Sequence, residues 1–187
     1  MRQRLLGTIP LLFLLHVACG RGRPERADRV AAAAQDTGGT GFRGGTAALH
    51  RPRAGPAAKT LRALTATAQP GYDRVVFEFA DDSLPGYHVE YANRPVVRCG
   101  SGDPVSLGGT AWLVVRFEPA QAHDERGNAT VHERDSSPGL PAVKQMMLVC
   151  DFEGQVEWVL GVAAAEPYRV AELAAPARLV VDVRQGP

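Results

Sequence analysis

The sequence predicts an all-β domain over residues 60–187, an antiparallel β-sandwich or open barrel of about eight or nine strands. Apolar and polar residues alternate with a period of two, most clearly over residues 75–79. Turn residues such as Pro85-Gly86 and Gly154 separate the alternating segments at short intervals. No segment of this region carries the sustained apolar stripe of an amphipathic helix. We therefore expect one domain with a core large enough to be stable by itself.

Each predicted strand places its apolar residues on one face. In chain order, the expected strands are residues 61–67, 74–79, 87–91, 113–118, 146–152, 156–162, 168–170 and 179–183. The two strands that flank Gly154 are expected to pair as a hairpin. Tyr87, Tyr91 and Trp158 are in phase with the aliphatic residues of their strands, so we assign them to the core.

Trp112 does not follow this pattern. Leu113, Val115 and Phe117 share one face of the predicted strand, and Trp112 falls on the opposite face. It therefore packs against a second layer of structure or is exposed. An exposed indole is a candidate for ligand contact, since its flat apolar face can stack on a sugar ring. Asp73, Arg74 and Arg116 are further candidates, because they could lie near Trp112 on the polar side of the strands.

Residues 1–19 have the anatomy of a secretory signal peptide. Arg2 and Arg4 precede an apolar run from Leu5 to Val17, and small residues follow it. This run is shorter than the roughly 20 apolar residues that a membrane-spanning helix needs. We expect the protein to be exported.

Cys19 follows Leu15-His16-Val17-Ala18, which resembles a lipobox except that His16 stands where leucine is usual. Two outcomes remain open. Lipidation of Cys19 would anchor the protein at the outer face of the cytoplasmic membrane. Ordinary cleavage near Ala18 or Gly20 would instead release a secreted protein.

Residues 20–59 are rich in Ala, Gly, Arg and Pro and contain few large apolar side chains, which predicts a disordered tether. The tether has eight basic and three acidic residues, a net charge of +5, whereas residues 60–187 have 11 basic and 17 acidic residues, a net charge of −6. The basic tether favours an anionic lipid or envelope polymer, unless coding bias and solubility alone explain its arginines. An exported protein with an acidic domain is a poor candidate for nucleic-acid binding.

Residues 60–187 resemble the AMIN-like domain of actinobacterial secreted proteins and lipoproteins. The segments that carry the resemblance are Tyr72 to Phe79, Pro85-Gly86-Tyr87 with Val89-Glu90-Tyr91, Ala122-His123-Asp124, the strand around Trp158, and Arg178 to Val183. The resemblance implies a β-sandwich or open barrel related to the AMIN domain, a non-catalytic part of cell-wall amidases and pilus secretins. That domain localises its host protein by binding the cell envelope, with peptidoglycan as the expected ligand. The resemblance supplies no catalytic residues, and fold alone does not fix function.

Cys99 and Cys150 are not part of the family pattern. If Cys19 is lipidated or removed, these two cysteines remain, and an oxidising compartment favours a disulfide between them. The alternative is that Cys150 is a small buried residue and Cys99 an exposed thiol.

The sequence contains no recognised catalytic motif. A polar loop holds His123, Asp124, His132 and three carboxylates of residues 125–135, which are suitable donors for a divalent cation. Their spacing matches no known metal site, so we expect neither a metal nor a cofactor.

Three functions are compatible with these observations. The first is a monomeric, exported, lipid-anchored module that binds cell wall or an anionic envelope polymer without catalysis. The second is an envelope protein-protein interaction module that uses an exposed sheet edge. The third is a hydrolase that uses the loop from His123 to Asp135.

Overall fold

Eleven β-strands and no helix form in the part of the chain that the computed structural model describes, residues 41–55, 57–93 and 95–187. The strands are β1 (Leu49–Arg51), β2 (Lys59–Gln69), β3 (Tyr72–Phe79), β4 (Gly86–Tyr91), β5 (Ala111–Glu118), β6 (Ala120–Gln121), β7 (Asp135–Ser136), β8 (Val143–Phe152), β9 (Gln155–Val162), β10 (Tyr168–Leu173) and β11 (Arg178–Arg184). The predicted signal peptide, Cys19 and residues 20–40 of the expected tether lie outside the described residues. Within those residues, no helix is long and apolar enough to cross a membrane.

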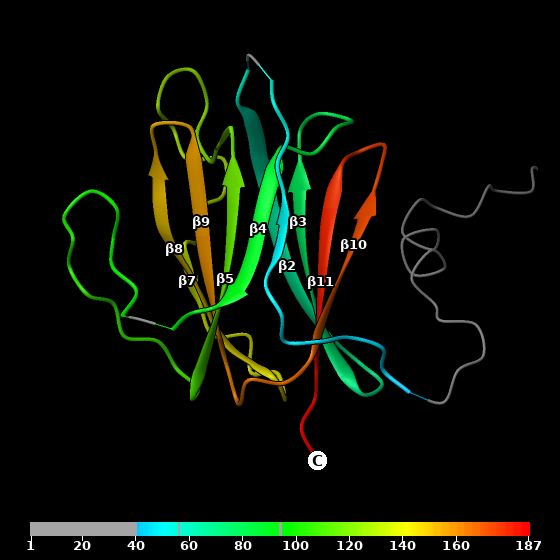
Figure 1. The fold of residues 1–187 in the computed structure, drawn as a ribbon. Helices are drawn as coiled ribbons and strands as arrows, with labels where there is room; N and C mark the ends of the chain where they lie inside the picture. The colour runs from blue at the N-terminus through cyan, green and yellow to red at the C-terminus, as the bar shows by residue number, and fades with distance from the viewer. Residues whose placement is uncertain (1–40, 56, 94) are drawn as a thin grey trace, which may run out of the picture. The chain divides into compact units, whose positions relative to one another are not determined.

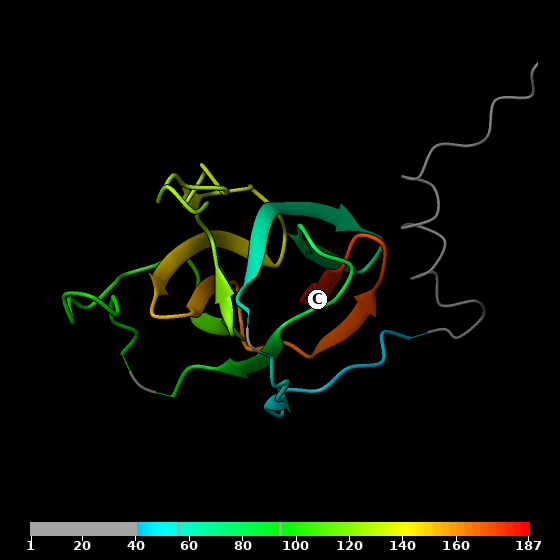
Figure 2. The same cartoon turned by 90° about the horizontal axis from the view of Figure 1, so that it is seen from above.

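The strands form two sheets that pack face to face (Figure 1). The six-stranded sheet has the order β1-β4-β5-β9-β8-β7, and the five-stranded sheet has the order β10-β11-β3-β2-β6. Neighbouring strands are antiparallel except β2 and β6, which are parallel. Both sheets curl, as the view from above shows (Figure 2). The predicted all-β sandwich is confirmed, and the eight predicted strands correspond to β2–β5 and β8–β11.

Alternating apolar side chains fill the space between the sheets. Val75, Phe77 and Phe79 of β3 are fully buried. The rings of Phe77 and Phe79 lie 5.2 and 5.1 Å from the ring of Phe117 on β5, measured between centroids. Edge-on and tilted contacts of this kind add to the free energy of burying aromatic area. The period-two pattern therefore identified the core correctly on these strands.

The predicted hairpin on either side of Gly154 is also present. β8 and β9 are antiparallel, and Phe152 lies opposite Gln155. The two residues between them, Glu153 and Gly154, have φ angles of 50° and 78°. Two central residues with positive φ are the geometry of the tight hairpin turns that match the twist of antiparallel strands.

Tyrosine hydroxyls join the two sheets at one edge of the sandwich. Tyr87 is buried, as predicted for the core, and Tyr91 packs against the core in a partly buried position. The Tyr91 hydroxyl donates a hydrogen bond of 2.5 Å to the carbonyl oxygen of Glu166. Burial raises the pKa of Tyr91 to about 12. The Tyr168 hydroxyl, on the opposite sheet, lies 2.8 Å from the Val89 carbonyl oxygen.

The central strands of the six-stranded sheet are buried on their outer face as well. A second apolar cluster there contains Val96, Leu107, Val114, Met147, Val149 and Val159. Two of these residues belong to the connection between β4 and β5, which covers the sheet. A disulfide between Cys99 and Cys150 ties the connection to β8, with the two Cα atoms 5.2 Å apart. The pairing that we considered from the sequence is therefore present.

Residues 41–55 contact the domain, although they fall within the segment expected to be a disordered tether. β1 pairs with β4, and Gly45 forms a backbone bridge with Tyr168. The guanidinium of Arg169 lies over the ring of Phe42, 4.9 Å from its centroid. In this part of the predicted tether, one aromatic residue and backbone pairing hold the chain without the apolar alternation that predicts a strand. We call residues 41–55 the N-terminal strap.

Candidate ligand-binding site

Asp73 points between the two sheets and is fully buried. Its carboxylate accepts hydrogen bonds from the backbone N–H groups of Ala142 and Val143, at 2.5 and 2.8 Å. It also accepts one from the Gln185 side-chain amide at 2.9 Å. Asp73 is thus in phase with the core side of β3, where it ties β3 to the start of β8.

Arg74 lies on the outer side of β3, but its charge is already paired. Its guanidinium donates hydrogen bonds to both carboxylate oxygens of Asp182, at 2.7 and 2.9 Å. This bond raises the pKa of Arg74 in spite of the opposing effect of burial. Asp182 also accepts a hydrogen bond from Arg169 at 2.9 Å. Arg74 is therefore part of a buried ionic row on the five-stranded sheet.

Trp112 lies on the outer face of β5, where it is partly buried against the second apolar cluster. From its phase we expected Trp112 either to pack against a second layer of structure or to be exposed. The structure shows that it packs against a second layer, the apolar cluster on the outer face of the six-stranded sheet. The indole is not fully covered, so its contact with a ligand remains a prediction. The structure does not bring Trp112 together with Asp73 or Arg74, which lie in the other sheet.

Arg116 lines a groove of about 590 Å³ at the open end of the same outer face. Its Nε donates a hydrogen bond of 2.6 Å to Glu157, and 40% of the Arg116 side chain is exposed. The groove lies between the strap and strands β4 and β5, and its charged and histidine side chains are His50, Arg53, His88, Glu90, Arg116 and Glu118. Cations, carboxylates and imidazoles in one open groove suit a polar ligand with charged groups.

Two histidines face each other in this groove. His50 of β1 lies opposite His88 of β4 in the strand register. Their Nδ1 atoms are 3.3 Å apart, and His88 Nε2 lies 3.3 Å from a carboxylate oxygen of Glu90. Sequence reasoning missed His50 because it lies in the expected tether, and only the pairing of β1 with β4 brings it to His88.

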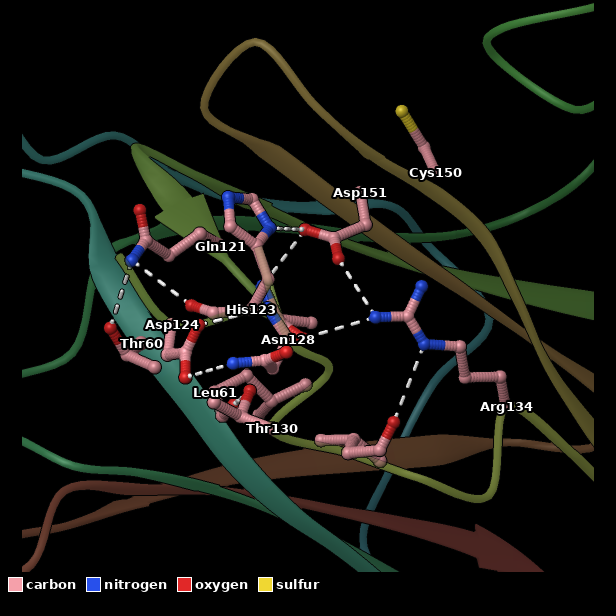
Figure 3. A network of polar contacts seen from close by, with 12 residues as sticks. Thr60, Leu61, Gln121, His123, Asp124, Asn128, Thr130, Arg134, Cys150 and Asp151 are labelled. Atoms are coloured by element: carbon pink, nitrogen blue, oxygen red, sulfur yellow. Dashed lines mark hydrogen bonds and ion pairs between the residues drawn. The ribbon is translucent and has the colours of Figure 1, made fainter. Parts of the chain in front are cut away.

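His123 and Asp151 form the centre of a second polar network, shown in Figure 3. The carboxylate of Asp151 accepts a backbone hydrogen bond from Ala122 at 2.9 Å, and His123 Nδ1 lies 2.9 Å from the same oxygen. Arg134 contacts the second oxygen at 3.2 Å. Among the described residues, no serine, threonine or cysteine side chain is hydrogen-bonded to the His123 ring. The network thus fastens the long polar loop to the end of β8.

The other weak metal candidates do not converge on His123. The carboxylate of Asp124 accepts hydrogen bonds from Arg126 and Asn128 within its own loop. The side-chain hydrogen bond from Asn128 lowers the pKa of Asp124. His132 lines a separate groove beside β2. In residues 41–55, 57–93 and 95–187, no group of three or more His, Cys, Asp and Glu side chains has the arrangement of a metal site.

Comparison with known proteins identifies the family. The model of the AMIN-like domain matches residues 59–185, which includes β2 to β11. The chain belongs to the AMIN-like domain family. Neither a curated protein nor a solved structure gave a match.

AMIN-like domains are in general non-catalytic binding modules found in exported envelope proteins, with a cell-wall-related partner. At this level the family agrees with the function expected from the sequence. The match begins at residue 59, so the strap lies before the part that matches the AMIN-like model. Two groove residues, His50 and Arg53, therefore lie outside the matched range.

The wall of the groove is held by a polar contact to the other sheet. The carboxylate of Glu172 on β10 accepts hydrogen bonds from Arg53 of the strap and from the Tyr87 hydroxyl, both at 2.7 Å. Burial and the bond to Glu172 raise the pKa of Tyr87 to about 12. Arg53 thus links the strap to the five-stranded sheet of the AMIN-like domain.

Proposed function

We propose that this protein is an exported, lipid-anchored module that binds the cell wall, with peptidoglycan as its ligand and without catalysis. The observation that carries the proposal is membership of the AMIN-like family over residues 59–185. The signal-peptide anatomy of residues 1–19 supports export, and the lipobox-like sequence before Cys19 supports anchoring.

We place the ligand at the outer face of the six-stranded sheet. Peptidoglycan combines sugar rings with peptide carboxylates, which call for an aromatic face and a cation. Arg116 offers a partly exposed guanidinium in the groove, and Trp112 lies on the same face of β5. Charge-assisted hydrogen bonds to carboxylates are stronger than neutral ones. Arg116 is therefore the first residue to test, and Trp112 the second.

A pelleting experiment tests the proposal. The chain from residue 20 onward is mixed with isolated protein-free cell walls, and saturable co-sedimentation is expected. Arg116→Ala should weaken binding about tenfold, as expected for one charged hydrogen bond. Trp112→Ala should also weaken it if the indole contacts the sugar.

Arg184→Ala is the matched control. Arg184 is 45% exposed and pairs with Glu166, in the same way that Arg116 is 40% exposed and pairs with Glu157. It does not line the groove. If the wild type stays in the supernatant at a large excess of wall, peptidoglycan is not the ligand. If both arginine variants bind like the wild type, the groove is not the site.

Lipid anchoring is tested separately in bacterial cells that express the full chain. We expect the protein to be labelled by a fatty-acid precursor and to sediment with membranes. Cys19→Ser should abolish the label and release the protein, whereas Cys19 without any label would mean ordinary cleavage and secretion.

A specific observation keeps the protein-interaction function as a second candidate. β10 is an edge strand of six residues, and Gly45 forms an isolated backbone bridge with its first residue, Tyr168. The edge strand of a sheet can accept a strand from a partner. Failure to bind walls, together with a defined protein that co-purifies with the chain, would favour this function.

A further inference from the structure

The facing histidines of the groove have the spacing of two ligands of one metal ion. His50 Nδ1 and His88 Nδ1 are 3.3 Å apart, and their ring centroids are 5.4 Å apart. Zinc bonds imidazole nitrogen at about 2.0–2.1 Å, so two nitrogens of a tetrahedral zinc site are about 3.3–3.4 Å apart. Side chains on paired strands can therefore hold such an ion between the two Nδ1 atoms with little movement.

Glu90 favours metal binding by the Nδ1 atom of His88. Its carboxylate lies 3.3 Å from His88 Nε2, near enough to favour the neutral tautomer of His88 that carries its proton on Nε2. His88 Nδ1 then carries a free electron pair that faces His50. A carboxylate behind a histidine ligand fixes the ring and increases its basicity, which is a common feature of protein metal sites.

The charges around the pair permit a cation. Arg116 lines the same groove, but Glu157 pairs with it at 2.6 Å. Arg53 is likewise paired with Glu172 at 2.7 Å. Glu118 lines the groove and adds a further carboxylate. The imidazoles are open to solvent, since His50 is exposed and 26% of the His88 side chain is exposed.

We propose that His50 and His88 form a chelating site for a late first-row divalent metal ion, Zn²⁺ or Cu²⁺, in which Glu90 positions His88. Each histidine gives its Nδ1 electron pair to the ion, and the proton that bridges the two rings moves to Nε2 of His50 by exchange with solvent. No net proton is released. Water or an anionic group of a bound molecule completes the coordination.

The ion would clamp the strap to the domain. β1 has three residues, and its pairing with β4 is its link to the six-stranded sheet. A metal bond between His50 and His88 adds a second link at the centre of that pairing. The proposal does not depend on wall binding, because the ion can be measured in the absence of walls.

Calorimetric titration of the untagged chain from residue 20 onward with Zn²⁺ at neutral pH tests the site. We expect one ion per chain and no binding of Mg²⁺, which prefers oxygen ligands. His50→Ala and His88→Ala should each weaken binding by about tenfold or more, and Glu90→Gln should weaken it by about tenfold. Circular dichroism checks that the variants are folded.

His132→Ala is the control, because His132 is also exposed but lies in a separate groove. It should bind like the wild type. Electron paramagnetic resonance with Cu²⁺ gives an independent measurement, with two nitrogen ligands expected in the wild type and one in His50→Ala. Absence of Zn²⁺ binding by the wild type, or equal binding by His50→Ala, would overturn the proposal.

Discussion

At the scale of single residues, one buried carboxylate joins the two sheets. Asp73 accepts two backbone hydrogen bonds from the start of β8 and one from Gln185. Its removal would leave buried donors without partners, and this is more costly than the loss of the bonds themselves.

Asp73→Ala is therefore expected to lower the free energy of unfolding by about 3 kcal/mol. Urea unfolding followed by tryptophan fluorescence measures the change. The exposed carboxylate of Glu125 gives the control, since Glu125→Ala should stay within about 0.5 kcal/mol of the wild type. A similar stability of both variants would contradict the role assigned to Asp73.

The carboxylate of Glu172 should make the free energy of unfolding depend on pH. Burial acts to raise its pKa, but hydrogen bonds from Tyr87 and Arg53 outweigh this effect and lower the pKa below the ordinary value of 4.5. A carboxyl group with a lowered folded-state pKa stabilises the protein above its unfolded-state pKa. This contribution disappears as the pH falls through the lowered value.

The stability difference between the wild type and Glu172→Gln should therefore be largest at neutral pH and should shrink as the pH falls below 4.5. Urea unfolding at several pH values tests this. Glu125→Gln should show no such trend. A difference that stays constant down to acidic pH would mean that the charge of Glu172 is not the cause.

At the scale of elements, the connection from β4 to β5 acts as a lid on the outer face of the six-stranded sheet. Val96 and Leu107 of the connection pack against Val114 and Val159, and the Cys99–Cys150 disulfide fixes it to β8. In its described residues, 92–93 and 95–110, the connection has no strand of its own, so the disulfide and these contacts help to determine its position.

Reduction of the disulfide should lower the free energy of unfolding by about 4 kcal/mol, since the cysteines are 51 residues apart and the cost of loop closure grows with length. Denaturant unfolding with and without a reducing agent measures the effect. The double variant Cys99→Ser with Cys150→Ser should be as unstable as the reduced protein and insensitive to the reagent. Equal stability of the oxidised and reduced forms would contradict this prediction.

At the scale of the whole molecule, the strap, which precedes the first long strand β2 in the chain, contacts both sheets of the domain. Phe42 contacts Tyr72 and Arg169 on the five-stranded sheet, while β1 extends the six-stranded sheet. Arg53 bonds across to Glu172. Residues 41–55 therefore link both sheets, and they also supply one wall of the groove.

A chain that begins at residue 60 should be less stable than one that begins at residue 41 by at least about 2 kcal/mol, through the loss of aromatic and cation–π contacts. Urea unfolding of the two forms tests this. Phe42→Ala in the longer form should reproduce part of the loss. Identical stabilities would mean that the strap adds nothing to the fold.

The sequence by itself determined the fold class, the family and most of the core. Period-two alternation on strands such as β3 and β5 records which side of each strand is buried, because successive side chains point to opposite faces. The out-of-phase Trp112 likewise indicated a second layer as one of two alternatives. These features are local, so one strand carries enough information to reveal them.

Only the tertiary structure decided which residues meet across strands. β1 is three residues long and has no apolar pattern, so neither its pairing with β4 nor the approach of His50 to His88 can be derived from the sequence. The orientation of Asp73 toward the backbone of β8 is also a contact between distant segments. Such contacts depend on strand order and register, which the packing of the complete sandwich determines.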